Sequence, residues 1–543
     1  MNAITDMNTK PAGLLYRPLV QMLVIALVAF VAYSNSFRVP FVFDDKPSIT
    51  ENVVIQGLEN FFTNWSGYDF LPNRFIGYLT FAFNHEIGGL NVSGYHVVNL
   101  AIHIVNALLV YALVRLTMKT PFFGSRPQVP SPESLVPVLA ALLFVSHPIQ
   151  TQAVTYIVQR LTSLATLFYL ASLVLHVRWR LAQTAGVPFV SRSVLPWYLL
   201  SLVSAVLAMK TKEIAFTLPV VILLYEFSFF GRPGRRLLPM LLPLLLTIFI
   251  IPLTMVNVQK PVGEILSDVH SKSIAGTDLS RGEYLSTQFS VIVTYLRLLV
   301  LPINQNLDYD YPVSHSLLEP RAFLSLLLLL VLMGYAAWLW RTSSSSQSPV
   351  PSPGLYRLAA FGIIWFFITL SVESSIIPIQ DVIFEHRLYL PSIGFVAAFV
   401  VLVMTAGELC AARLPAIKKL TIPVLAMSVL MLTGATYARN NVWKDELTLW
   451  EDTKSKSPMK ARPHNNLGYA YGKQKRIPEA IAEFETAVQL APEYLDALYN
   501  LAQLYFLSGR YQETEELTRT LKRLNPETFK TLDALRDNKK VPD

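Results

Sequence analysis

Long runs of apolar residues, separated by short polar segments, recur along about the first four fifths of the chain. Eleven of these runs are long enough to cross a bilayer as helices. They are residues 15–34, 95–117, 134–148, 152–177, 194–209, 214–230, 236–257, 320–340, 356–372, 389–410 and 418–437. Beyond residue 440 the sequence turns polar, with apolar residues at helical spacing. The pattern predicts an all-α protein with a polytopic membrane domain over 1–440 and a helical C-terminal part.

Lysine and arginine gather in alternate loops between the apolar runs. The basic clusters are Arg115/Lys119/Arg126, Arg178/Arg180/Arg192, Arg232/Arg235/Arg236, Arg341/Arg357 and Arg413/Lys418/Lys419. The positive-inside rule puts all of them on the cytoplasmic side if the N-terminus is cytoplasmic. Lys10 lies before the first run and Arg17 lies at its start, without a small-residue cleavage site, which is typical of an uncleaved anchor.

One apolar segment, 287–302, is short and contains Arg297. If it crossed the membrane, the later basic clusters would face the wrong side. We therefore predict a helix that lies at, or dips into, the outer surface. This gives eleven crossings and a C-terminal part outside the cytoplasm. The alternative is twelve crossings with a cytoplasmic C-terminus.

The C-terminal part contains an internal repeat. Leu467, Gly468, Tyr471, Ala480, Phe484, Ala487 and Pro492 fit the tetratricopeptide pattern, and Leu501, Ala502, Tyr505 and Pro526 fit it again in the next copy. We predict a linking half repeat at 441–460, two repeats at 461–528 and a tail at 529–543. Such an α-solenoid makes a concave surface that binds peptides or proteins, and its alternative role is a structural cap. So short an array is expected to pack on the membrane domain or on a partner.

Composition narrows the functional classes. The chain is 52% hydrophobic and 15% charged, as expected of a membrane protein rather than a soluble one. The net charge of +8 comes from short loops between spans, so it does not indicate nucleic-acid binding. The single cysteine, Cys410, excludes an intrachain disulfide framework and a thiolate metal cluster.

Two adjacent acids, Asp44 and Asp45, follow the first apolar run among aromatic and aliphatic residues. Carboxylates at the edge of a membrane helix are costly to bury, so they usually have a function. The alternative is a solvated acid pair at a helix end. Other polar residues are predicted on the same outer surface, namely Arg74, His147, Arg160, Lys210, Lys212, Glu213, Glu385, His386 and Arg387. Each alone has an ordinary explanation, such as snorkelling or helix capping, but their shared location favours a site.

These residues suit the transfer of a sugar from a phosphate. A carboxylate removes the proton of an attacking hydroxyl, and Asp44 is our first choice, with Asp45 in a positioning role. Cations stabilise the phosphate leaving group. The candidates for that contact are Arg387, Lys212, Arg160, Arg74, His147 and His386. An apolar groove among the spans is expected to hold the lipid tail of the donor.

Several short motifs carry a family resemblance. They are Phe43-Asp44-Asp45, Tyr95–Asn99, His147-Pro148 with Arg160, Lys212-Glu213 with Tyr225-Glu226, Arg387–Gly394, and Val442–Asp445 before the repeats. In this order they resemble the C-type glycosyltransferase superfamily, specifically the transmembrane-and-tetratricopeptide protein O-mannosyltransferases and their bacterial relatives. The resemblance implies transfer of mannose or another hexose from a polyprenyl-phosphate donor to Ser or Thr of a protein. It also implies inversion of the configuration at the anomeric carbon of the sugar, without a cofactor.

The resemblance further implies a bacterial inner-membrane protein with its repeats outside the cytoplasm. We expect Tyr471, Asn500 and Tyr505 to contact the acceptor protein. Two departures leave the sugar and the acceptor open. The repeat array is much shorter than in the eukaryotic members, and Arg74-Phe75-Ile76 stands where Arg-Pro-Leu is expected.

A metal site and three other functional classes are alternatives to this interpretation. Asp44, Asp45, His85, Glu86 and His147 offer hard ligands, but no spacing requires an ion, and we expect no metal. A transporter or flippase would need polar residues near the bilayer midplane and repeated spans. A non-enzymatic scaffold would need only one span. The third alternative keeps the fold and transfers the sugar to a glycolipid or a surface polysaccharide.

Overall fold

The structure, a computed structural model, describes residues 16–124, 132–232, 234–235, 237–255, 279–345, 352–375, 377–411 and 413–526. The regular elements within these ranges are all helices, so the predicted all-α class is confirmed. The chain forms two compact units. Unit 1 comprises Met1–Ile303 and Val313–Asn441, and unit 2 comprises Asn304–Pro312 and Val442–Asp543. The predicted tail at 529–543 lies outside the described residues.

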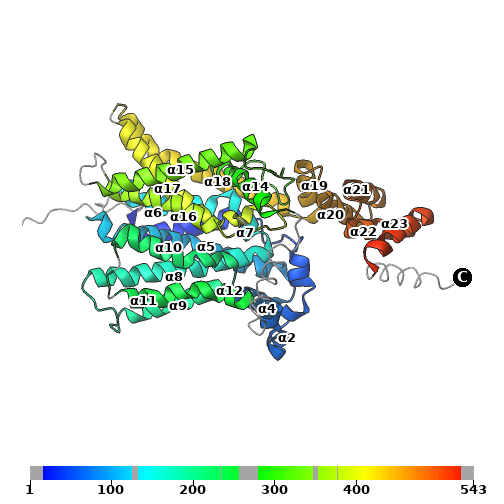
Figure 1. Cartoon of the computed structure of the whole chain (residues 1–543), viewed down its shortest axis with the longest axis horizontal. Helices are drawn as coiled ribbons and strands as arrows, with labels where there is room; N and C mark the ends of the chain where they lie inside the picture. Colours follow the sequence, from blue (N-terminus) through cyan, green and yellow to red (C-terminus); the bar gives the residue numbers. More distant parts are fainter. Residues whose placement is uncertain are drawn as a thin grey trace, which may run out of the picture. The chain divides into compact units, whose positions relative to one another are not determined.

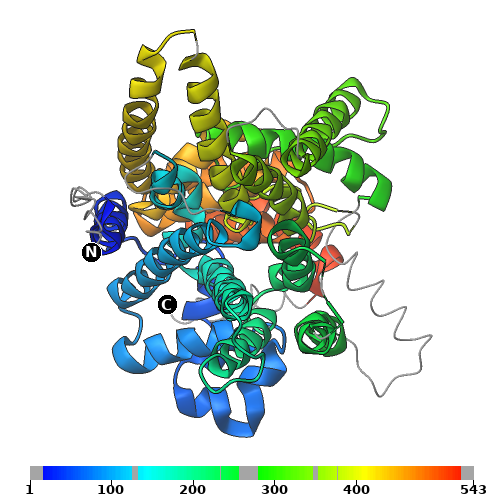
Figure 2. The ribbon, with the colours of Figure 1, turned by 90° about the vertical axis from the view of Figure 1, so that its left-hand side faces the viewer.

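Unit 1 is a bundle of apolar helices (Figures 1 and 2). Among the described residues, 7 helices are long and apolar enough to cross a membrane, or 8 if one bent pair is a single span. The seven are Val92–Thr117, Ile157–Thr184, Glu213–Phe230, Pro320–Ser344, Pro353–Leu370, Pro391–Ala411 and Lys419–Trp443. The bent pair is Glu133–Ser146 with Pro148–Val154, and shorter apolar helices cover Pro18–Tyr33, Leu195–Met209 and Leu238–Thr254. These coincide with the predicted apolar runs, while the number that cross stays a prediction.

Individual helices keep their labels below. The long ones are α5 (Val92–Thr117), α8 (Arg160–Thr184), α15 (Pro320–Ser344), α16 (Pro353–Leu370), α17 (Pro391–Ala411) and α18 (Ala416–Asn440). Others are α1 (Pro18–Tyr33), α6 (Val136–Ser146), α9 (Leu195–Met209), α10 (Leu218–Tyr225), α11 (Leu238–Leu246) and α12 (Ile250–Met255). Figure 2 looks from one end of the bundle and shows α17 and α18 as a yellow hairpin at its rim.

Several short helices and the longer α14 gather at one end of unit 1, to the right in Figure 1. They include α2 (Leu58–Phe62), α3 (Ser66–Phe70), α4 (Phe75–Gly88), α7 (Thr151–Val154) and α14 (Arg281–Val300). Helix α14 covers the predicted surface segment and is not among the described helices long and apolar enough to cross. It buries polar side chains, including Thr287 and Gln288. Its position at the outer surface stays a prediction.

Small and polar residues let the helices of unit 1 pack closely. Gly362 on α16 faces Gly394 on α17, and a Cβ added at Gly394 would lie 2.4 Å from the carbonyl oxygen of Gly362. A side chain at either position would separate the two helices. Between α5 and α8, the Asn106 amide donates to the carbonyl of Ser163 at 2.8 Å. Such bonds satisfy polar groups where water is excluded.

Unit 2 contains helical hairpins. Helix α19 (Glu446–Lys456) precedes the pairs α20 (Ala461–Lys473) with α21 (Ile477–Leu490) and α22 (Leu495–Leu507) with α23 (Tyr511–Leu524). Ala480, Phe484, Leu501 and Tyr505 form a hydrophobic core between the pairs. Gly468 lies against Phe484, where an added Cβ would approach the ring to 2.9 Å. The small residue of the repeat pattern is therefore needed for close packing.

Unit 2 also includes a nine-residue segment, Asn304–Pro312, from the connection between α14 and α15. Asp308 of this segment is 1% exposed. Arg462 donates to both of its carboxylate oxygens, each at 2.6 Å, and Lys460 pairs with it as well. Asn306 donates to the hydroxyl of Ser457 at 2.8 Å. We did not predict this segment as part of the repeat unit.

Candidate active site

The turn at Phe43–Asp45 is fixed by its own backbone and by the segment before α8. The Asp45 carboxylate accepts from the backbone N–H groups of Val42 at 3.0 Å and Val158 at 2.7 Å. Its side chain is fully buried, whereas Asp44 is half-buried. Adjacent side chains in a non-helical turn point in different directions. Asp45 therefore anchors the turn, and Asp44 is the more accessible carboxylate.

The burial of Asp45 also affects its pKa. Burial raises the pKa of Asp45 to about 8; the hydrogen bonds from Val42 and Val158 oppose this rise, and the charge of Asp44 adds to it. Near neutral pH this disfavours a negative charge on Asp45. Of the pair, Asp44 is better suited to carry the charge of a general base. This agrees with the predicted roles, which stay predictions.

A second group of predicted residues meets around the turn between α9 and α10. Arg74 donates to both oxygens of Glu213, at 3.1 and 3.2 Å. Lys212 donates to the hydroxyl of Thr162 at 2.8 Å and lies 3.3 Å from a carboxylate oxygen of Glu373. Sequence reasoning missed Glu373, although a charged residue directly after an apolar run was a usable signal.

Local packing explains why the loop that ends at Arg74, directly before α4, reaches this turn. The backbone N–H of Ile76 donates to the carbonyl of Lys210 at 3.0 Å. Next to it, Gly77 has no side chain, and an added Cβ would lie 2.1 Å from Leu161. The loop can therefore approach the start of α8 closely, and this brings Arg74 to Glu213.

The segment before α17, Glu385–Leu388, supplies two more predicted residues. Arg387 donates to the carbonyls of Asp381 at 2.7 Å and Val382 at 3.2 Å. His386 is buried, and its Nδ1 has no hydrogen-bond partner. Burial lowers the pKa of His386 well below its usual value, and the charges of Lys212, Arg387 and Arg74 lower it further. Each of these three cations therefore lies within electrostatic range of His386, and we call His386 together with Lys212, Arg387 and Arg74 the cation cluster.

Arg160 occupies a different position. It is fully buried and donates to Asn99 Oδ1 at 2.6 Å, the Tyr95 carbonyl at 3.0 Å and the Thr80 carbonyl at 3.2 Å. Its guanidinium also lies over the Phe81 ring, 4.6 Å from the centroid. These bonds tie α4, α5 and α8 together. The structure thus gives Arg160 a structural role, and a phosphate contact from it would require these bonds to break.

Both ring nitrogens of His147 also form hydrogen bonds within the fold. Its Nδ1 accepts from the backbone N–H of Ile149 at 3.1 Å, and its Nε2 donates to the carbonyl of Leu299 at 3.0 Å. His147 therefore caps the short helix Pro148–Gln150 with a neutral ring. The structure does not bring it into the cation cluster.

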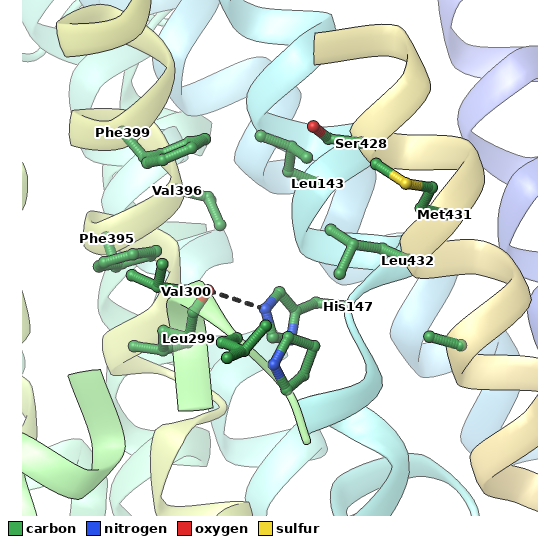
Figure 3. A pocket seen from close by; sticks show the side chains of 13 residues that line it. Leu143, His147, Leu299, Val300, Phe395, Val396, Phe399, Ser428, Met431 and Leu432 are labelled. Carbon is green, nitrogen blue, oxygen red and sulfur yellow. Dashed lines mark hydrogen bonds between the residues drawn. The ribbon is translucent and has the colours of Figure 1, made fainter. Parts of the chain in front are cut away.

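A cavity of about 290 Å³ lies beside His147 (Figure 3). Its walls are mainly apolar side chains from α6, α17, α18 and the end of α14. The lining residues are Leu143, His147, Leu299, Val300, Leu301, Pro302, Phe395, Val396, Phe399, Ser428, Met431, Leu432 and Ala435. The helix that follows His147 packs on the segment carrying His386 and Arg387. The cavity is thus linked to the cation cluster through two adjacent segments.

The candidate metal ligands Asp44, Asp45, His85, Glu86 and His147 do not form a metal site. In the ranges that the structure describes, no group of three or more His, Cys, Asp or Glu side chains is placed to hold a metal ion. Glu86 accepts from the backbone N–H of Leu58 at 3.1 Å, and His147 is occupied as described above.

The three predicted acceptor contacts in unit 2 have different environments. Tyr505 is 6% exposed, lies in the hydrophobic core and donates to Glu485 at 2.6 Å. Tyr471 packs against the same core and donates to Glu451 at 3.2 Å. Asn500 donates to Asn465 at 3.0 Å. The two tyrosines therefore stabilise the repeats, and Asn500 is the one of the three that lies outside this core.

Comparison with known proteins bears on both units. Residues 473–536 match the tetratricopeptide repeat family. A protein O-mannosyl-transferase of Caenorhabditis elegans is 26% identical over 87% of this chain and 63% of its own length. The resemblance predicted from the motifs is confirmed. Protein O-mannosyl-transferase Tmtc3 of Drosophila melanogaster is 24% identical over 94% of this chain and 59% of its own. TMTC3 of Homo sapiens is 24% identical over 93% of this chain and 55% of its own.

The chain is thus related to these transferases along both units. It spans only 55 to 63% of the length of the three relatives named above. No solved structure matches the chain.

Proposed function

We propose that this protein is a membrane glycosyltransferase that moves mannose or another hexose from a polyprenyl-phosphate donor to Ser or Thr of a protein. The acceptor oxygen attacks the anomeric carbon and forms a new C–O bond, while the bond from that carbon to the phosphate oxygen breaks. Asp44 takes the hydroxyl proton, and polyprenyl phosphate leaves. Attack from the face opposite the leaving group inverts the anomeric configuration. The observation that carries the proposal is the cation cluster, in a chain related to protein O-mannosyl-transferases.

The cations suit a phosphate leaving group. Arg74, Lys212 and Arg387 bring three positive charges, and the carboxylates of Glu213, Glu373 and Asp381 lie against them. The unpaired Nδ1 of His386 lies within electrostatic range of these charges. A phosphate anion would accept hydrogen bonds from these cations and would supply the missing partner of His386 Nδ1. Arg160 and His147 are left out of this assignment because the charges that act on His386 are those of Lys212, Arg387 and Arg74.

The cavity beside His147 suits the lipid part of the donor. Its apolar walls would contact the first isoprene units, and its link to the cation cluster would hold the phosphate near Arg387. We infer that no cofactor or metal takes part, because a sugar with a phosphate leaving group already carries an activated anomeric carbon.

The repeats suit a protein acceptor, because tetratricopeptide arrays bind peptides and proteins. Asn500 is the candidate contact in unit 2, through an amide that can bond an extended backbone. The site would lie on the non-cytoplasmic side of a bacterial inner membrane, with unit 2 on the same side. A reporter active only outside the cytoplasm, fused after Asp543, should then be active, and a cytoplasmic reporter should be silent.

The test of the function is transfer in a purified system. The full chain in detergent or nanodiscs is given a radiolabelled polyprenyl-phosphate sugar and either an acceptor protein or a glycolipid. We expect label on Ser or Thr of the protein and a loss of transfer in Asp44→Asn. Label on the glycolipid alone would show that the acceptor is a lipid and not a protein. Wild-type transfer by both Asp44→Asn and Asp45→Asn would remove this acid pair from the mechanism. The acceptor protein can be sought by glycoproteomics of cells with and without the gene.

A further inference from the structure

Tyr156, directly before the segment that leads into α8, lies against Asp44. It is 1% exposed. Its hydroxyl oxygen accepts the backbone N–H of Asp44 at 2.9 Å, and the same hydroxyl is hydrogen-bonded to the Asp44 carboxylate. Its ring is stacked on Phe43, with centroids 6.5 Å apart and planes at 24°. One side chain therefore contacts the backbone, the carboxylate and the preceding residue of the proposed base.

The turn that Tyr156 supports is strained. Phe43 has φ of +49°, in the left-handed region that bulky residues rarely adopt. Such a conformation costs about 1–3 kcal/mol and persists only where the surroundings fix it. Asp45 fixes one side through Val42 and Val158, and Tyr156 fixes the other through Asp44. Both anchors reach residues 156–158, so a single short segment holds the whole turn.

The hydrogen bonds of the Tyr156 hydroxyl have a defined direction. Because its oxygen accepts the N–H of Asp44, its proton is available to the carboxylate of that residue. Burial raises the pKa of Tyr156 well above its usual value, and the charges of Asp44 and Asp45 raise it further. The phenol therefore keeps its proton at any working pH of the enzyme. A core tyrosine with only a packing role would need no such double contact.

We propose that Tyr156 is a positioning residue that aims the Asp44 carboxylate at the acceptor hydroxyl and holds it ionised by hydrogen bonding. This inference rests on the proposed function, in which Asp44 is the general base. The titratable groups that act on this pair are Asp45 in the same turn and Tyr156 itself, while the charge of Arg160 acts on Asp45. Sequence reasoning missed Tyr156, because it lies 112 residues from Asp44 in the chain.

The test is Tyr156→Phe in the purified full chain, which keeps the ring on Phe43 and removes only the hydroxyl. We expect kcat to fall about 10- to 100-fold, as for a misaimed catalytic group, with the donor KM changed less than about twofold. Loss of a hydrogen bond to a carboxylate raises its pKa. The acid limb of the kcat profile should therefore move to higher pH, because the base must be ionised to act.

Tyr111→Phe is the matched control. Tyr111 is also a buried tyrosine, and its hydroxyl donates to Gln21 at 2.7 Å. It lies about four turns along α5 from Tyr95, away from the acid pair. This variant should lose a comparable buried hydrogen bond but keep the wild-type kcat and pH profile. If Tyr156→Phe also keeps the wild-type kcat and pH profile, Tyr156 has only a packing role, and the inference is overturned.

If Tyr156→Phe fails to fold, a second variant tests the inference. Replacing Tyr156 with 3,5-difluorotyrosine keeps the shape of the side chain and strengthens donation by the phenol. The acid limb should then move to lower pH, and an unmoved limb would overturn the inference. Asp44→Asn is assayed in parallel. If it is inactive while Tyr156→Phe is wild-type, only the positioning role falls; if it is fully active, the proposed base falls as well.

Discussion

The ammonium group of Lys212 lies 3.3 Å from the carboxylate of Glu373, so one of the candidate phosphate contacts is paired with an acid. We expect Lys212→Met to lower the free energy of unfolding by about 3 kcal/mol, because it leaves a largely buried carboxylate without its partner. The double variant Lys212→Met/Glu373→Gln should recover most of this stability but no transfer activity. Thermal unfolding and donor kinetics of the two variants and of Glu373→Gln test this. Recovery of both properties would mean that Lys212 serves only the ion pair.

Arg387→Ala should reduce kcat/KM for the donor by about 10²- to 10³-fold, as expected for loss of a charged contact to a leaving phosphate. Arg387→Lys should recover only part of the rate, because a planar fork becomes a point charge. Arg387 also donates to Asp381 and Val382, so folding must be checked separately. Arg297→Ala, which removes a largely exposed arginine that bonds the carbonyl of Ile303, is the control. Wild-type turnover in folded Arg387→Ala would place the phosphate elsewhere.

Asp45 should make the stability of the protein depend on pH. Its pKa rises from about 4 in an unfolded chain to about 8 in the folded protein. The folded state therefore holds a proton in this range that the unfolded state has released, and stability should fall as pH rises from about 4 to about 8. Asp45→Asn should lack this component. It should also be less stable at pH 5, because its amide nitrogen faces a backbone N–H.

The measurement is the thermal unfolding midpoint of wild type and Asp45→Asn at pH 5, 7 and 9. The difference between the two proteins should shrink or reverse as pH rises. A difference that is constant with pH would show that Asp45 keeps the same protonation state in both the folded and the unfolded chain.

Asn500→Ala should separate acceptor binding from folding in unit 2. We expect transfer to a protein acceptor to fall about 3- to 10-fold through loss of a hydrogen bond, with transfer to a short peptide unchanged. Tyr505→Phe serves as the comparison, because it removes a hydroxyl bonded to Glu485 within the repeats. It should lower stability without changing the preference between the two acceptors. Equal losses on both acceptors for Asn500→Ala would assign the array to folding alone.

Hydropathy was sufficient to predict the long apolar helices of unit 1 but not α2, α3 and α4, since only a long apolar run has few ways to satisfy its backbone in a membrane. The charged residues in the turns between apolar runs also indicated Arg74, Lys212, His386 and Arg387, and the three cations do lie within electrostatic range of His386. The bonds of Arg160 to Asn99 and of His147 to Leu299 could not be predicted. Whether a buried cation binds a ligand or the fold depends on partners far away in the sequence. The contacts of Tyr156 and Glu373 could not be predicted for the same reason.

The salt bridges of Asp308 with Lys460 and Arg462 mean that the repeat array is not a self-contained cassette. Part of it is encoded between two helices of the membrane unit, so the array cannot be exchanged with that of a relative by a single C-terminal crossover. A recombinant fragment beginning at Val442 would leave Lys460 and Arg462 without the carboxylate they share. Changes at Asp308 and at these two cations should therefore be inherited together. Soluble fragments for study should carry a grafted copy of Asn304–Pro312.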